Sequence, residues 1–175
     1  MWDVNAAATM PALASASPSF ASVAEAELDA VHAYLLFLTG DRAVAEDLAG
    51  ETFEKALRTW RRFDPRRGTA RAWLCAIARN SALDHFRSEQ RRRRREEHYA
   101  RDVSTVDDPA SGQGAAAVAL RKLPAADREV VALRIVLELD GPTTARLLGI
   151  TRTACSTRLS RALQRLEELM RDDDV

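Results

Sequence analysis

The side chains best suited to chemistry in this sequence are arginines, and half of them lie in one segment. Thirteen arginines occur between residues 58 and 95, against three acidic residues, Asp64, Asp84 and Glu89. The formal net charge of the whole chain is zero, so one strongly basic segment is offset by acidic residues elsewhere. This asymmetry indicates a polyanionic partner for the basic segment. The run Arg91–Arg95 is suited to a phosphate backbone, and binding of that kind weakens as salt increases.

A second group of polar residues follows a glycine turn near the C-terminus. Residues 142–148 predict a short helix that ends at Gly149, after which Ile150 faces the core and Thr151 caps another helix. This order is typical of a helix-turn-helix, whose second helix brings its N-terminal residues to base edges in the major groove of DNA. Arginine and hydroxyl side chains can bind bases or phosphates. The candidates here are Arg152, Thr153, Ser156, Thr157, Arg158 and Arg161.

Two longer helices must position the basic segment. The first is expected from an N-cap at Asp41 to about Trp60, and the second from about Thr69 past Arg91. The first helix has an apolar stripe made of Ala45, Leu48, Ala49, Thr52, Phe53, Ala56 and Trp60. Its opposite face carries Asp47, Glu51, Glu54 and Arg58. The second helix buries Leu74, Ile77, Ala78 and Ser81, and its polar face aligns Asn80, Asp84, Arg87 and Arg91.

These patterns predict an all-α protein of two small helical domains. Apolar residues make up 46% of the chain and aromatic residues only 6%, which favours helices packed through alanine and leucine. We expect a disordered leader at residues 1–23, a first domain at 24–101, a flexible linker at 102–115 and a second domain at 116–175. Thirteen of these residues, 102–114, could span roughly 44 Å when extended. That exceeds one turn of DNA, about 34–36 Å, so the domains could occupy separate sites on one duplex.

Several function classes are disfavoured. No stretch approaches the roughly 18 apolar residues that a membrane span requires, and the N-terminus lacks the pattern of a signal peptide, so we expect a cytoplasmic protein without membrane insertion. Cys75 and Cys155 are expected to be buried small residues rather than a disulfide or a zinc site. His32, His85 and His98 have no metal or triad spacing. We therefore expect no catalytic residues, no metal, no cofactor and no enzymatic activity.

Two long motifs carry a family resemblance. Residues 40–57 and 71–84 look like region 2 of the extracytoplasmic-function (ECF) sigma factors of the sigma-70 family. Residues 123–134, the helix-turn-helix and the sequence Arg-Leu-Ser-Arg-Ala at 158–162 resemble region 4. Order, spacing and linker agree over roughly residues 25–170. The resemblance implies a subunit that binds core RNA polymerase and directs it to promoter DNA.

The same resemblance implies a role for each polar face. Asp47, Glu51 and Glu54 would dock on the clamp helices of the polymerase β′ subunit, and region 4 would contact the β flap. Arg66, Arg67, Arg71, Asn80, Asp84 and Arg87 would bind the −10 element, where a base is extruded at a cost of a few kcal/mol. The second helix of the helix-turn-helix would read the −35 element. Members of the family are also commonly restrained by an anti-sigma factor.

Some positions depart from the family pattern. Gly50 lies where glutamine is frequent, and residues 142–144 replace a more helix-friendly segment. Cys155 and Ser156 replace a β-branched and a basic residue, and the first helix of region 2 is expected to be shortened by Pro18–Ser22. Trp73 is expected in the core, although it could stack on a base. Two alternatives remain open: a helix-turn-helix regulator that does not deliver polymerase, and a degenerate sigma-like interaction protein.

Overall fold

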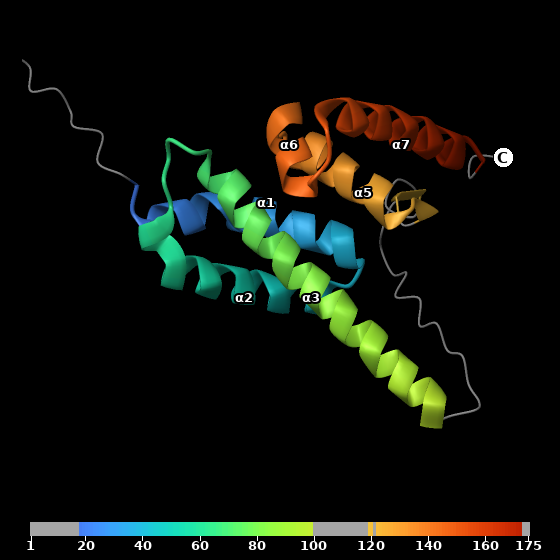
Figure 1. The fold of residues 1–175 in the computed structure, drawn as a ribbon, viewed down its shortest axis with the longest axis horizontal. Helices are drawn as coiled ribbons and strands as arrows, with labels where there is room; N and C mark the ends of the chain where they lie inside the picture. Colours follow the sequence, from blue (N-terminus) through green and yellow to red (C-terminus); the bar gives the residue numbers. More distant parts are fainter. Residues whose placement is uncertain (1–17, 100–118, 121, 173–175) are drawn as a thin grey trace, which may run out of the picture.

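The computed structural model describes residues 18–99, 119–120 and 122–172, and these contain helices and no strand. In the first domain, α1 (Phe20–Thr39) and α2 (Arg42–Thr59) pack together. A 3-10 turn, η1 (Trp60–Arg62), leads into the loop before α3 (Ala70–Tyr99). Helix α3 packs on both α1 and α2 and continues beyond them as a long arm (Figure 1).

The second domain consists of shorter elements followed by one long helix. Helix α5 (Ala125–Val131) passes directly into η2 (Ala132–Val136), a turn of π-helix. Helix α6 (Gly141–Leu148) and helix α7 (Arg152–Asp172) follow, and α7 packs on both α5 and α6. The expected all-α fold with two helical domains is therefore confirmed, while the predicted linker at 102–115 lies outside the described residues.

The first helix corrects one expectation. Helix α1 begins at Phe20, inside the leader predicted at residues 1–23, and it has 20 residues rather than a shortened form. The physical reason is local: the Ser19 side chain accepts a hydrogen bond from the Ser22 backbone N–H and thus caps the helix. In addition, the Phe20 ring meets the Trp60 ring edge-on at 5.5 Å, which ties the first turn to the domain.

The expected apolar stripes form the core of the first domain. Asp41 caps α2 by accepting from the Val44 N–H at 3.0 Å. The fully or almost fully buried residues of α2 and α3 include Ala45, Leu48, Ala49, Thr52, Ala56, Leu74, Ala78 and Ser81. Phe53, Trp60 and Ile77 pack against this core while half-buried. Gly50 lies exposed in the middle of α2 with nothing within 4 Å of an added Cβ, so the space there does not require glycine.

The helix-turn-helix forms despite its unusual first helix. Asp140 caps α6 by accepting from the Thr143 N–H at 2.6 Å, and Pro142 lies in the first turn, where proline is tolerated. Thr144 is fully buried, and its hydroxyl donates to the Asp140 carbonyl at 2.9 Å, which offsets the cost of burying it. Gly149 takes the left-handed conformation (φ 66°) that ends α6. The prediction of a helix-turn-helix is confirmed.

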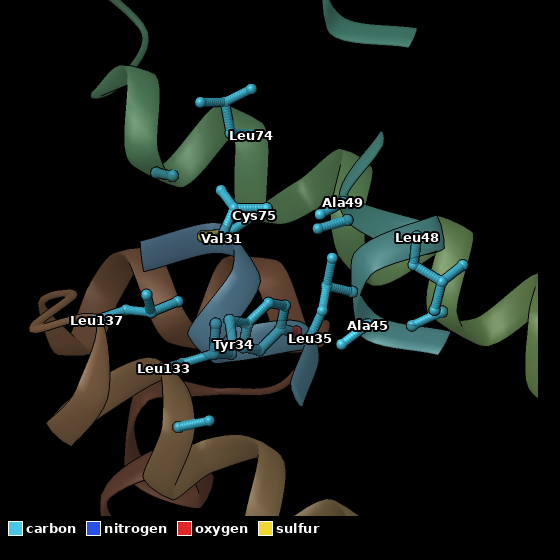
Figure 2. Packing of buried hydrophobic residues seen from close by; sticks show 14 of the residues in the cluster. Val31, Tyr34, Leu35, Ala45, Leu48, Ala49, Leu74, Cys75, Leu133 and Leu137 are labelled. Carbon is cyan, nitrogen blue, oxygen red and sulfur yellow. The ribbon is translucent and has the colours of Figure 1, made fainter. Parts of the chain in front are cut away.

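The two domains are packed against each other rather than held apart. One core cluster includes Val31, Tyr34 and Leu35 of α1 together with Leu133 and Leu137 from the second domain. Figure 2 shows Tyr34 lying between the first-domain core and Leu133. Tyr34, Leu35 and Leu133 are fully buried. The sequence does not predict this contact, because the apolar stripe of each helix can also be buried within its own domain.

Candidate nucleic-acid interfaces

The loop between η1 and α3 presents two arginines to solvent. The Asp64 carboxylate accepts from the Arg66 N–H at 2.9 Å, and the Asp64 carbonyl accepts from the Arg67 N–H at 3.0 Å. These bonds fix a turn whose Arg66 and Arg67 side chains remain exposed. Exposed guanidinium groups on a turn whose backbone is fixed are suited to phosphate contacts, which position a nucleic acid without reading its sequence.

The polar face of α3 continues this basic surface. Asn80, Asp84 and Arg87 are exposed, as the helical spacing predicts. Asp84 and Arg87 form an ion pair of 3.1 Å on the surface, so Arg87 is held along the helix rather than extended from it. Arg91–Arg95 are also exposed on the arm of α3. The surface thus runs from the loop along α3, with net positive charge over most of its length.

An aromatic cluster lies beside the loop. Phe63 stacks on Trp60 at 4.9 Å, and its ring centre lies 5.4 Å from that of Trp73. Trp73 packs against the core as expected but is half-buried, and it also lines a cavity of about 470 Å³. The same cavity is lined by Arg67 and Asn80. Aromatic faces next to arginines can stack and hold an unpaired base.

Arg71 does not join this surface. Its Nε donates to Glu27 of α1 at 2.7 Å, and one of its Nη atoms donates to the Leu137 carbonyl at 3.4 Å. The hydrogen bond to Glu27 raises the pKa of the guanidinium. In this arrangement Arg71 links α3 to α1 and to the second domain, while the other five −10 candidates are exposed.

The N-terminal part of α7 forms a second polar surface. Thr151 caps the helix by accepting from the Ala154 N–H at 3.1 Å. Cys155 and Ala162 are buried on the opposite side and pack toward α5 and α6. The surface residues are Arg152, Thr153, Ser156, Thr157 and Arg161, which are exposed, and Arg158, which is half-buried. Their placement at one end of a rigid helix is the geometry that major-groove reading requires.

The acidic face of α2 lies on a different side of its helix from the core. Asp47, Glu51 and Glu54 are all exposed. Glu51 pairs with Lys55, and Glu54 pairs with Arg58, both along the helix. Ion pairs this exposed contribute little to stability, so the folded state does not depend on them. The acidic face is therefore available to a partner.

The cysteines and the metal-ligating residue types can also be placed within the described part of the chain. No group of three or more metal-ligating side chains occurs among residues 18–99, 119–120 and 122–172. Cys75 and Cys155 are buried and unpaired, and burial raises the pKa of the Cys75 thiol to about 12. A thiol with such a pKa is a poor nucleophile at neutral pH. Within the same residues, no helix combines the length and apolar character of a membrane span.

The structure also places functional candidates that the sequence did not single out. Arg62 lines the cavity beside Trp73, and Thr143 and Arg146 of α6 complete its wall from the second domain. Glu129 contacts Arg79 and Tyr34 across the domain boundary. The sequence indicated Arg79 only as one of the thirteen arginines between residues 58 and 95. No local pattern in a single sequence pairs residues 50 positions apart.

Comparison with known proteins assigns the family. Residues 23–92 match sigma-70 region 2, and residues 114–166 match sigma-70 region 4. The chain is 33% identical over 169 residues to the ECF RNA polymerase sigma factor BldN of Streptomyces coelicolor, a match that covers 93% of this chain and 64% of BldN. It is 31% identical to the ECF sigma factor SigC of Mycobacterium tuberculosis, covering 77% of this chain and 75% of SigC.

A solved structure agrees with these matches. The sigma factor RpoE of Bartonella quintana, in complex with the anti-sigma factor NepR, has a TM-score of 0.74 and 25% identity. The likeness covers 87% of this chain and 96% of that chain. The chain therefore belongs to the sigma-70 family, in its ECF group.

Proposed function

We propose that this protein binds core RNA polymerase and directs it to promoter DNA. The observation that carries the proposal is the presence of two exposed polar surfaces, on α3 and on α7, in a chain whose two domains match sigma-70 regions 2 and 4. The protein would act in the cytoplasm, where polymerase is found, and it would act as an initiation factor without catalytic residues or cofactor. Its domains would be region 2 up to residue 101 and region 4 from residue 116.

For the −10 element, we assign the loop and α3. Arg66 and Arg67 would hold phosphates, and Asn80, Asp84 and Arg87 would follow the strand along α3. Arg71 would join them only after leaving Glu27 and the Leu137 carbonyl. The cluster of Phe63 and Trp73 would offer a stacking surface to an extruded base, which helps to offset the cost of unstacking.

For the −35 element, we assign the start of α7. Arg152, Thr153, Ser156 and Thr157 lie on its first two turns, where base edges come within reach. Arg158 follows directly, Arg161 lies one turn beyond Thr157, and both are suited to guanine or phosphate contacts. These side chains are positioned by the Thr151 cap and by Cys155, which anchors the opposite side of the helix in the core.

For polymerase, we assign the acidic face of α2 to the β′ clamp helices, with region 4 contacting the β flap. The support is an exposed row of Asp47, Glu51 and Glu54 on a helix whose other side is firmly packed. We also infer an anti-sigma factor as a further partner, because RpoE of Bartonella quintana was solved in complex with one.

Charge reversal on α2 tests the polymerase contact. The double variant Glu51→Lys and Glu54→Lys is expected to weaken binding to core polymerase by about tenfold or more, since like charges opposed across an interface cost several kcal/mol. Titration of labelled protein with core polymerase measures this directly. The double variant Glu25→Lys and Asp29→Lys changes the charge equally at two exposed acidic positions on α1; it is the matched control and should bind like the unchanged protein.

The same titration separates the proposal from its main alternative. A helix-turn-helix regulator that does not deliver polymerase would show no measurable binding of the unchanged chain to core polymerase. Equal weakening by the α2 double variant and by the α1 double variant would show a general charge effect, and the assignment of the α2 face would then be wrong.

A further inference from the structure

We propose that Arg165 of α7, held in place by Asp127 of α5, is a further DNA-binding residue, and that it binds a phosphate of the duplex backbone beside the −35 element. The proposal rests on the −35 assignment made above, and it extends that site along α7 as far as the fourth turn. Arg165 adds affinity without reading sequence, whereas Asp127 is a positioning residue that does not itself touch DNA.

The first support is a basic hollow between α5 and α7. A cavity of about 630 Å³ lies there, and its wall includes Thr153, which is assigned to base reading. The same cavity continues along α7 past Arg158 and Arg161 to Arg165. Arginine and threonine side chains are among the groups that hold DNA phosphates. The hollow is therefore continuous with the −35 surface and carries the chemistry that a phosphate backbone requires.

The three arginines of the hollow form a row along one side of α7. Arg158, Arg161 and Arg165 are three and four positions apart, so helical geometry makes them neighbours on the helix surface. At 1.5 Å per residue, the row rises about 10 Å along the helix axis. The major groove of DNA is about 8.5 Å deep. A row of this length that begins beside the base-reading residues leads from the floor of the groove to the backbone at its edge.

The second support is the ion pair that fixes Arg165. One Nη atom of Arg165 donates to the Asp127 carboxylate at 2.6 Å. The Asp127 side chain is only 16% exposed, whereas that of Arg165 is 51% exposed. The carboxylate is thus held within the protein, while the guanidinium stays open to a ligand. Because a guanidinium has five N–H donors, one bond to Asp127 leaves others for a phosphate, and fixing the long side chain in advance lowers the entropy cost of binding.

The helices that carry the pair are held together by packing and not by the pair itself. Helices α5 and α7 pack on each other and share a core cluster that contains Val130, Cys155 and Ala162. An ion pair with one half-exposed partner contributes little to stability. Removing either member of the pair should therefore leave α5 and α7 in place, so that a change in DNA affinity reports on the site.

Substitution of Arg165 tests the phosphate contact. Arg165→Gln is expected to weaken binding of the full-length chain to a fluorescein-labelled duplex containing the −35 element by about fivefold at about 0.15 M salt. The slope of log affinity against log salt should become shallower by about 0.9, the value for one lost phosphate contact. A duplex of scrambled sequence should lose affinity by the same factor, because a phosphate contact does not read bases. Fluorescence anisotropy over a range of salt concentrations measures all three quantities.

Two arginine variants make the result specific. Arg165→Lys keeps the charge and should keep the salt slope. Arg171→Gln makes the same change as Arg165→Gln at the far end of α7, outside the hollow, and should leave the slope unchanged. An unchanged slope with Arg165→Gln would overturn the site, and so would an equal fall with Arg165→Gln and with Arg171→Gln.

Asp127→Ala tests the positioning role, because charge and positioning predict opposite signs. If charge alone mattered, removing a carboxylate beside DNA would strengthen binding. We expect instead that duplex affinity falls about two- to threefold, because Arg165 is no longer held in advance. In the Arg165→Gln background, Asp127→Ala should cause no further loss, since no side chain is left to position. An unchanged or higher affinity of Asp127→Ala in the presence of Arg165 would overturn the role of Asp127.

The outcomes for this site and for the proposed function are distinguishable. If Arg165→Gln weakens binding to core polymerase but not to the duplex, the hollow serves a protein partner and the DNA site is overturned. If the slope changes as expected while the unchanged chain fails to bind core polymerase, the proposed function is contradicted and the site stands. Circular dichroism checks that each variant is folded, and Arg165→Ala, which introduces the best helix former, repeats the measurement if Arg165→Gln loses its helical signal.

Discussion

Leu133→Ala is expected to lower the free energy of unfolding by about 2–5 kcal/mol, the usual cost of emptying a fully buried leucine site. Leu133 is completely buried and belongs to the core cluster shared by both domains (Figure 2). Urea unfolding followed by tryptophan fluorescence measures the change. Trp60 and Trp73 both lie in region 2. A lower urea midpoint in their fluorescence would therefore show that a substitution in region 4 destabilises region 2 through the contact between the domains.

The control for this prediction lies two residues away. Ile135 is 54% exposed in the same π-helical turn, and Ile135→Ala should change the stability by no more than about 0.5 kcal/mol. If Leu133→Ala leaves the tryptophan transition at its original urea concentration while region 4 unfolds separately, the domains are not coupled, and the shared core is contradicted.

Arg158→Ala is expected to weaken binding to a duplex containing the −35 element by roughly 5- to 150-fold, which corresponds to about 1–3 kcal/mol for a lost bidentate base contact. The reason is the position of Arg158 at the end of the second turn of α7, next to the exposed residues that are assigned to base reading. Fluorescence anisotropy at fixed salt measures the affinity. Affinity for core polymerase should remain unchanged, since the β′ contact is assigned to α2 and Arg158 lies on the part of α7 that is assigned to DNA rather than to the β flap.

Arg171→Ala is the matched control on the same helix. Arg171 lies at the far end of α7 and is paired with Glu167 at 2.8 Å on the surface. Its loss should reduce duplex affinity by no more than about twofold, because an exposed ion pair contributes little. A comparable loss from both substitutions would contradict the assignment of base reading to the start of α7.

Local signals account for the features that could be predicted from the sequence. Asp41 and Thr151 cap helices through their own side chains, and Gly149 ends one through a left-handed backbone. Each of these depends on residues within four positions of one another. The exposed faces of α2, α3 and α7 also followed from helical spacing, because one stripe of each helix is buried and the rest must face solvent.

The features that escaped prediction depend on contacts between distant segments. Glu129 of α5 accepts from Tyr34 of α1 and from Arg79 of α3, and Arg71 pairs with Glu27 across 44 positions. Helical spacing places a side chain on a face, but it does not say which other element covers that face. Glu138 is a separate case: the turn after η2 holds it at a positive φ of 53°, a conformation that its residue type does not predict.

The role of the chain as a sigma factor is tested most directly by run-off transcription with core RNA polymerase across a promoter library. We predict initiation at a sequence-defined subset of promoters when the chain is present, and its loss with the Glu51→Lys and Glu54→Lys double variant. Initiation that does not exceed that of core polymerase alone, or that shows no dependence on promoter sequence, would contradict the role proposed for this protein.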